Sequence, residues 1–266
     1  MKVGIMALPQ SGRRTVFTLL TGDAAAAARP EGKDAITGVA PVLDPRFDRL
    51  VAMYHPKKET RARTTVELIP PLEENTVKEG AVFRDIAGTD ALCLVARDFL
   101  DDSVYHVRGS VDALRDIDAV MGELLLHDLL LIEKRLERIA EGKKRSRDER
   151  AEKEEPVLSR MRDHLERDLP LRTMELSDEE RKLLAGYSFI TMKEMIVVLN
   201  TGENALSDEA RVASVRERFA SSSISVIKLS ARLEAEIAAL DSGEEREAFM
   251  KEAGIAETAL SLLTRT

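Results

Sequence analysis

A short segment near the start of the chain carries a glycine among polar and basic side chains. It reads Ala7-Leu8-Pro9-Gln10-Ser11-Gly12-Arg13-Arg14-Thr15. A glycine-containing turn between a strand and a helix presents backbone N–H groups and a helix dipole to phosphate. The usual pattern is G-x-x-x-x-G-K-[S/T], and only its second glycine, Gly12, is present here. Taken alone, the segment is explained equally well as a plain turn between a strand and a helix.

The elements that would position this turn follow from the apolar pattern. Residues 2–8 predict a buried strand, and helical spacing then continues to a stop at Gly22. Residues 23–37 predict a loop, and 38–56 a strand, an Asp-Pro turn and a helix. Further short apolar or β-branched runs predict strands at 64–69, 91–99, 195–200 and 224–229. Such strands separated by helices predict a parallel sheet covered on both faces.

The middle of the chain has a different pattern. Between residues 111 and 141 the apolar side chains are spaced by four, three, four and three, at Leu125, Leu129, Ile132, Leu136 and Ile139. Residues 141–155 are almost entirely charged, and helical spacing resumes from Val157 to Pro170. These patterns predict an antiparallel helical hairpin with a solvated tip; a partner contact at the tip is the alternative. Ser177 and Glu180 have capping-box spacing and predict a short helix that ends near Gly186.

Composition narrows the class of protein. The chain has 266 residues, is 44% hydrophobic and carries a formal net charge of -8. An acidic chain has no general attraction to nucleic acid or anionic membrane, so such contacts need a local basic patch, and we expect no direct DNA binding. The single cysteine, Cys93, excludes an internal disulfide and suits a reducing compartment. No apolar run is long enough for a membrane span or a signal peptide, which predicts a cytoplasmic protein without a membrane partner.

The order of motifs along the chain resembles that of a known family. The stretch ALPQSGRRTVFTLLTG resembles GLPNVGKSTLFNALT of the YchF, or Obg-like ATPase, family of P-loop GTPases. The resemblance continues through GVAPVLDPRFDRL, TTVEL, GTDALCLVARDF, PLRTMELSDEERKLLAGYSFIT and MIVVLNTGE, and ends with KLSARLEAEIAALDSGEEREAFMKEAGIAETAL. It spans nearly the whole chain and implies a nucleotide-binding protein.

The resemblance also implies an architecture. It is an α/β P-loop NTPase G domain with a mostly parallel sheet flanked by helices, interrupted by an antiparallel coiled-coil hairpin. We expect residues 1–110 and 186–266 to form the G domain and 111–185 to form the insertion. The family also carries a C-terminal TGS domain that would begin near Thr266, so the protein either lacks it or the chain is truncated.

The phosphate loop departs from the family pattern at two positions. Gly12 matches the loop glycine, and Arg13 stands where the family has its phosphate-binding Lys. Arg keeps the charge but presents a bulkier planar group. Arg14 stands where the Mg²⁺-binding Ser should be, and a guanidinium cannot ligate a cation. Thr15 follows and could donate to phosphate, but its shifted position makes it a doubtful metal ligand.

The elements that would complete a metal site are also altered. The D-x-x-G motif expected after the third strand is replaced by Ile69-Pro70-Pro71. Asp85-Ile86-Ala87-Gly88 spells D-x-x-G later, and we interpret it as part of a helix; a relocated switch motif is the alternative. Thr37 is the nearest candidate for the switch threonine, with an ordinary loop residue as the alternative. We therefore assign no metal ligand and no catalytic residue, and Mg²⁺ binding is doubtful.

The base-recognition elements match the family better. Asn200-Thr201-Gly202-Glu203 matches its N-x-x-E, which stands in place of the guanine-reading N-K-x-D and which the family associates with relaxed or adenine preference. Turn chemistry around Gly202 is the alternative. Ser230-Ala231-Arg232 matches the S-A-K motif, whose backbone N–H contacts the base. His106 and His127 are interpreted as structural.

Two functions follow from these matches. The first is an ATP- or GTP-binding protein with weak or no hydrolysis, whose nucleotide lies against Pro9, Gln10, Ser11, Gly12, Arg13, Arg14, Thr15, Asn200, Glu203, Ser230 and Ala231. The second is a scaffold that binds no nucleotide. The family's association with translation implies a ribosome or another protein as the partner, with the helical hairpin as its contact surface.

Overall fold

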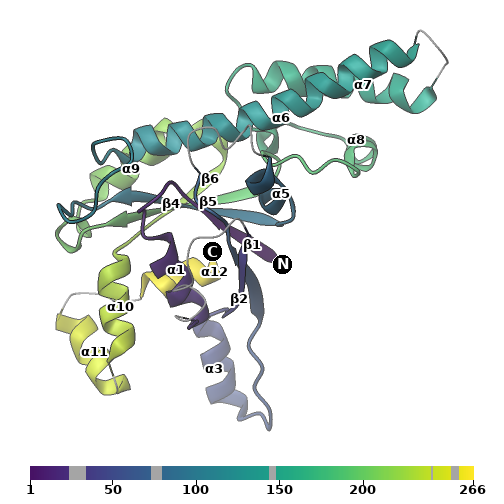
Figure 1. The fold of residues 1–266 in the computed structure, drawn as a ribbon. Coiled ribbons are helices and arrows are strands. Elements are labelled where there is room, and N and C mark those ends of the chain that lie inside the picture. The colour runs from purple at the N-terminus through teal and green to yellow at the C-terminus, as the bar shows by residue number, and fades with distance from the viewer. Residues whose placement is uncertain (24–33, 73–79, 144–147, 241, 253–257) are drawn as a thin grey trace.

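The protein contains one six-stranded sheet, which has helices on both faces, and a long helical hairpin extends at one side (Figure 1). The computed structural model describes residues 1–23, 34–72, 80–143, 148–240, 242–252 and 258–266. Most of the predicted loop 23–37 lies outside the described residues, as does part of the predicted hairpin tip, 144–147.

The sheet has the order β2-β3-β1-β4-β5-β6. Its strands are β1 (Lys2–Met6), β2 (Ile36–Pro41), β3 (Arg63–Leu68), β4 (Ala91–Asp98), β5 (Glu194–Thr201) and β6 (Ile224–Leu229). All neighbours pair in parallel except β2, which lies at the edge and runs antiparallel to β3. The mostly parallel sheet is therefore confirmed. Thr37 was predicted to lie in a loop, and it instead forms part of β2, opposite Glu67.

Helices cover both faces of the sheet. The elements are α1 (Arg13–Thr21), α3 (Pro45–Tyr54), α5 (Ala81–Ala87), α6 (Ala113–Lys143), α7 (Glu149–Leu165), α8 (Asp178–Leu184), α9 (Glu209–Arg218), α10 (Ala231–Ala239), α11 (Gly243–Glu252) and α12 (Ala259–Arg265). One core cluster joins the sheet to α5, α6 and α9, and a second joins the other face to α1, α10 and α12. In Figure 1 these two sets of helices lie on opposite sides of the strands.

The hairpin is formed by α6 and α7, and α6 belongs to two cores. Ile117, Val120 and Leu124 in the first half of α6 pack on the sheet, whereas Ile132 and Ile139 in its second half pack against α7. The helix thus runs without interruption from the face of the sheet into the hairpin (Figure 1). The predicted capping box of Ser177 and Glu180 is present at the start of α8.

The charged run between residues 141 and 155 is less solvated than predicted. Residues 149–155 form the first turns of α7, and Glu154 has no exposed surface at all. Its Oε2 accepts hydrogen bonds from Arg135 Nη2 at 2.6 Å and from the Tyr187 hydroxyl at 2.9 Å, and its Oε1 accepts one from Arg150 Nε at 2.7 Å. The carboxylate therefore ties both hairpin helices to the segment that follows α8. Burial alone would raise the pKa of Glu154, but these hydrogen bonds outweigh it and hold the pKa below its usual range.

A second buried carboxylate fastens the hairpin to the sheet. Asp128 of α6 has no exposed surface and accepts hydrogen bonds from the backbone N–H of Ile190 at 3.0 Å and of Thr191 at 2.7 Å, and from the Thr191 hydroxyl at 2.7 Å. Ile190 and Thr191 lie shortly before β5, so this carboxylate connects the middle of α6 to the start of the strand that carries Asn200.

We expect Glu154→Gln to destabilise the protein by about 2 kcal/mol at pH 7, because charge-assisted hydrogen bonds are lost from a buried group. The folded pKa of Glu154 lies below its unfolded value, so its contribution is complete above the unfolded pKa and is lost as pH falls through the folded pKa. The difference between wild type and variant in urea unfolding should therefore shrink below about pH 4.5. Glu155→Gln, at a surface pair with Lys143, is the control and should change stability by less than about 0.5 kcal/mol. A pH-independent difference would contradict the assignment.

Candidate nucleotide-binding site

The loop between β1 and α1 has the backbone shape of a phosphate-binding turn. Gln10 and Gly12 have φ angles of 59° and 88°, in the left-handed region. Helix α1 begins directly after Gly12, which is its N-cap and has no side chain to accept from the first turn. The first N–H groups of a helix have no intrahelical acceptor, and with the helix dipole they favour an anion. This geometry fits a phosphate group.

Asn200 fixes this loop to the ends of two other strands. The side chain is 4% exposed; its Nδ2 donates to the Ser11 carbonyl at 2.9 Å, and its Oδ1 accepts from the Ala231 N–H at 2.9 Å. A Cβ on Gly12 would collide with the Asn200 amide. Gly12 is therefore required both by its backbone angle and by its neighbour. The contact brings together three predicted segments that are far apart in the sequence.

The two arginines of the loop lie on the side facing β3. Arg13 is only 4% exposed, and its Nη1 donates to the Ile69 carbonyl at 3.0 Å. Arg13 and Arg14 line a small hollow together with Asp34, Ile36, Leu68, Pro70 and Pro71. The guanidinium of Arg13, predicted to be a phosphate ligand, therefore contacts the backbone just after β3. Thr15 lies within the first turn of α1.

The predicted base-recognition residues lie together at the ends of β5 and β6. Ser230 is buried, and its hydroxyl caps α10 by accepting from the Leu233 N–H at 3.4 Å. Glu203 is half exposed, and its Oε1 lies 3.9 Å from Arg232 Nε. Arg232 was not among the predicted site residues. Its position after Ser230 and Ala231 was visible in the sequence, but its approach to Glu203 depends on the fold.

The donor groups near the loop do not fit a magnesium ion. Arg14 offers a cation where a hydroxyl is required, and Ile69, Pro70 and Pro71 have no carboxylate. Within the described ranges there is no group of three His, Cys, Asp or Glu side chains placed to hold a metal. Magnesium in a nucleotide site takes most of its oxygen ligands from phosphates and water and only one or two from the protein, and at Arg14 and Ile69-Pro70-Pro71 this chain has no oxygen-bearing side chain to supply them.

The later D-x-x-G sequence does not replace the missing motif. Asp85 lies in α5, and Gly88 caps the end of that helix. The chain then passes directly to β4, and the Asp90 N–H donates to the Lys2 carbonyl at 2.7 Å. That contact lies at the start of β1, whereas the phosphate loop follows its end. The helical interpretation is therefore correct, and the alternative of a relocated switch motif is wrong.

A buried pair beside the loop was missed by sequence reasoning. His106 Nε2 lies 2.9 Å from Asp116 Oδ2, and both side chains are buried. Together with Ser11 and Arg97 they line a small hollow. Asp116 follows His106 by ten residues on another element, so spacing alone gave no indication of the pair. His127 instead stacks on Phe83 with ring centroids 4.3 Å apart, and burial lowers its pKa.

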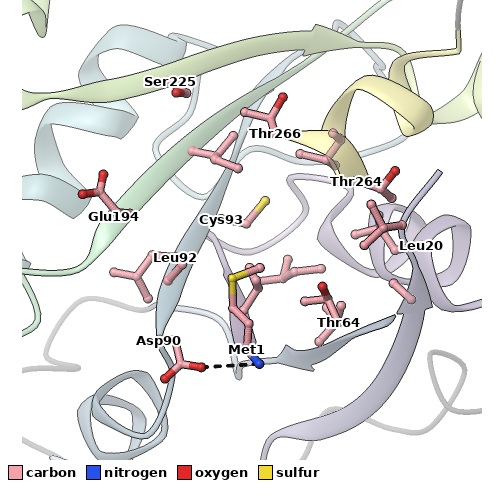
Figure 2. Close-up of a pocket in the computed structure, with 18 of the residues that line it drawn as sticks. Met1, Leu20, Thr64, Asp90, Leu92, Cys93, Glu194, Ser225, Thr264 and Thr266 are labelled. Atoms are coloured by element: carbon pink, nitrogen blue, oxygen red, sulfur yellow. Dashed lines mark ion pairs between the residues drawn. The ribbon is translucent and has the colours of Figure 1, made fainter. Parts of the chain in front are cut away.

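A larger hollow lies elsewhere and is separate from this site. It has a volume of about 380 Å³ and lies beside the first residues of the parallel strands and α12. Figure 2 shows Leu92, Cys93 and Glu194 around it. Burial raises the pKa of the Cys93 thiol to about 12, so this thiol is unreactive at neutral pH. The phosphate loop lies at the opposite ends of these strands.

Comparison with known proteins identifies the family of this chain. No family model matches the chain. It is 33% identical over 271 residues to the "Ribosome-binding ATPase YchF" of Bacillus subtilis strain 168, covering 98% of this chain and 74% of that protein. It is 34% identical over 272 residues to the protein of the same name in Escherichia coli O157:H7, with 99% and 74% covered.

The chain belongs to the YchF family. It is also 31% identical over 209 residues to "Obg-like ATPase 1" of Caenorhabditis elegans, covering 76% of this chain and 53% of that protein. The solved Schizosaccharomyces pombe YchF GTPase shares the fold, with a TM-score of 0.78 and 24% identity over 99% of this chain and 73% of that one. No helix in the described part of this YchF-family chain is both long and apolar enough to cross a membrane.

We expect Gly12→Ala to destabilise this YchF-family protein more than Gly22→Ala. Both glycines have positive φ angles, 88° and 71°, so each substitution has a similar backbone cost of about 1 kcal/mol. Only at Gly12 would the new methyl group collide with Asn200, because no atom lies near the corresponding position at Gly22. Urea unfolding of the two variants measures the difference. Equal losses of stability would show that the contact with Asn200 is unimportant.

We expect Asn200→Ala to lower the free energy of unfolding by about 2–3 kcal/mol, because it leaves the Ser11 carbonyl and the Ala231 N–H without their partner. The control is Asn204→Ala, at an exposed residue close by in the sequence, which should have almost no effect. Hydrogen exchange should also accelerate at the Ala231 amide in the first variant. An unchanged exchange rate at Ala231 would contradict the proposed bridge.

Proposed function

We propose that this chain binds ATP or GTP on the loop formed by residues 9–15, with little dependence on Mg²⁺ and negligible hydrolysis. The observation that carries the proposal is the start of α1: a helix whose N-cap is a left-handed glycine, fixed by Asn200 to the ends of β5 and β6. This arrangement presents backbone donors at a rigid position. It supports phosphate binding even though the usual loop pattern is incomplete.

The loop's own side chains supply positive charge to the phosphates. Arg13 and Arg14 lie at its helical end, where the dipole also favours an anion. A guanidinium pairs well with phosphate oxygens and keeps its charge at any physiological pH. Arg13 would have to exchange part of its contact with the Ile69 carbonyl for a phosphate oxygen. We therefore expect nucleotide binding to be weak.

Hydrolysis is proposed to be negligible because the transferred phosphoryl group lacks its usual electrostatic support. Phosphoryl transfer depends on positioning and on neutralising charge around the transferred group. A magnesium ion contributes several kcal/mol of that stabilisation, which corresponds to orders of magnitude in rate. The described donor set does not fit such an ion, and Arg14 substitutes only for its charge. We assign no catalytic residue.

The base is proposed to lie beside Glu203 and the first turn of α10. Glu203 is half exposed, so its carboxylate can accept hydrogen bonds from a base in competition with the nearby Arg232 guanidinium. Asn200 already uses its amide within the protein, so its part is to position the Ala231 segment. Glu203 stands where the Asp of N-K-x-D recognises guanine. The motif therefore does not select GTP, and we propose that either ATP or GTP binds.

The partner is proposed to be a ribosome. The Bacillus subtilis and Escherichia coli relatives are named ribosome-binding ATPases, which supports the same partner for this chain and a cytoplasmic location. The helical hairpin is one surface that supports a contact, because Leu126, Leu130 and Leu131 of α6 are partly exposed. The second candidate function, a scaffold that binds no nucleotide, is favoured by Arg14 and by Ile69-Pro70-Pro71.

Calorimetric titration with ATP, GTP and ADP, each with Mg²⁺ and with EDTA, tests the proposal. We expect weak binding whose affinity changes by less than about threefold on removing the metal, because Arg14 and Ile69-Pro70-Pro71 stand where the family has its Mg²⁺-holding Ser and Asp. Arg13→Lys combined with Arg14→Ser should make binding stronger in Mg²⁺ than in EDTA. Arg181→Ala with Lys182→Ala, at exposed cations of α8, is the control and should leave the titration unchanged.

Two outcomes would contradict this proposal. Tight, Mg²⁺-dependent binding by the wild-type protein would show that a metal site is intact. The absence of binding by any nucleotide, with or without metal, would leave only the scaffold function.

A further inference from the structure

A projection formed by residues 44–63 extends from the edge of the sheet and buries none of its side chains. It consists of α3 and the segment that returns to β3, and in Figure 1 α3 lies apart from the other helices. Its base is firmly held: the Leu43 N–H donates to the Thr264 hydroxyl at 3.1 Å, and the Leu43 carbonyl accepts from Ser261 at 3.2 Å. The projection is therefore an ordered element without a core of its own.

The helix of the projection exposes a cluster of large apolar side chains. Leu50, Met53 and Tyr54 are 55%, 68% and 72% exposed, and their spacing places them on one face of α3. A helix with an apolar stripe normally buries it against the protein, yet α3 buries no residue. Exposed apolar side chains that cluster on one surface are typical of an interaction site.

The projection is also basic, unlike the rest of the chain. Residues 44–63 contain six Lys or Arg and three Asp or Glu, a formal charge of +3, so the remainder of the chain carries -11 to give the total of -8. Arg46 and Arg61 pair with Asp44 and Asp48, respectively. Arg49, Lys57 and Lys58 have no ion-pair partner among the described residues. This is the kind of local basic patch that an acidic chain needs to contact a polyanion.

We propose that this projection is a docking surface for ribosomal RNA. Arg49, Lys57 and Lys58 are available to pair with phosphates, and Tyr54 offers a ring on which an unpaired base can stack. Leu50 and Met53 provide apolar contact beside these charges. The choice of RNA rests on the proposed ribosome partner, which is supported by the names of the bacterial relatives. The surface lies on a different element from the helical hairpin.

The test compares three forms of this 266-residue chain. They are the wild type, the triple variant Arg49→Ala, Lys57→Ala and Lys58→Ala, and the double variant Met53→Ser and Tyr54→Ser. None of these side chains is buried, so the variants should fold, as checked by thermal melting.

Binding is measured by co-sedimentation with purified bacterial ribosomes and by filter binding to the protein-free RNA extracted from them. We expect the triple variant to bind both probes at least about tenfold more weakly, with a salt dependence reduced by two to three phosphate contacts. The double variant should lose affinity without a change in salt dependence.

The control variant removes three other exposed cations, Arg181, Lys182 and Lys251, and should bind like wild type. Equal binding by the wild-type protein and the triple variant, or a loss confined to the control, overturns the proposal and leaves the hairpin as the ribosome contact. Binding to ribosomes but not to their RNA overturns it in favour of a ribosomal protein. Co-sedimentation with phosphatidylglycerol vesicles is measured in parallel, and binding to the vesicles but to neither ribosomal probe overturns the proposal in favour of a membrane. If the wild-type protein binds neither ribosomal probe, both this surface and the ribosome partner are wrong, whereas the nucleotide proposal is judged separately by its own titration.

Discussion

The Asn200 side chain is the contact on which the candidate site depends. One amide group accepts from the start of α10 and donates to the loop after β1, so a single planar group sets the relative positions of three chain segments. Because the amide is buried, neither hydrogen bond competes with water, and losing the side chain would leave two backbone groups unsatisfied. The left-handed glycine at position 12 follows from the same contact, since a larger residue would occupy the space of that amide.

The hairpin depends on a comparable use of buried polar groups. Glu154 and Asp128 have no exposed surface, and each accepts at least three hydrogen bonds from the protein. Burying a carboxylate is unfavourable unless its acceptors are satisfied. The two acids therefore specify one arrangement of α6, α7 and the segment before β5, and they do so with more directional precision than apolar packing alone.

Much of the architecture could be predicted from the sequence, because short apolar runs and helical spacing report burial directly. The hairpin, the α8 capping box and the mostly parallel sheet follow from such local patterns. The direction of β2 could not be predicted, since an alternating run looks the same in either orientation. The burial of Glu154 was also hidden, because it depends on Arg135 and Tyr187, which are distant in the sequence. At the site, motif matching found the segments that meet, but the pairing of His106 with Asp116 and the contact of Arg13 with Ile69 arise only from the fold.

Helix α6 is continuous and connects the surroundings of the phosphate loop to the outer end of the hairpin. The helix has 31 residues and is therefore about 46 Å long. Asp116, in its first turn, holds His106 beside Ser11, while its last residues reach the outer end of the hairpin. A helix resists compression along its axis unless it bends, and the hydrogen bonds of Asp128 hold this one at its middle. The outer end of the hairpin and the residues beside the phosphate loop therefore lie at two ends of one helix whose middle is fixed by Asp128.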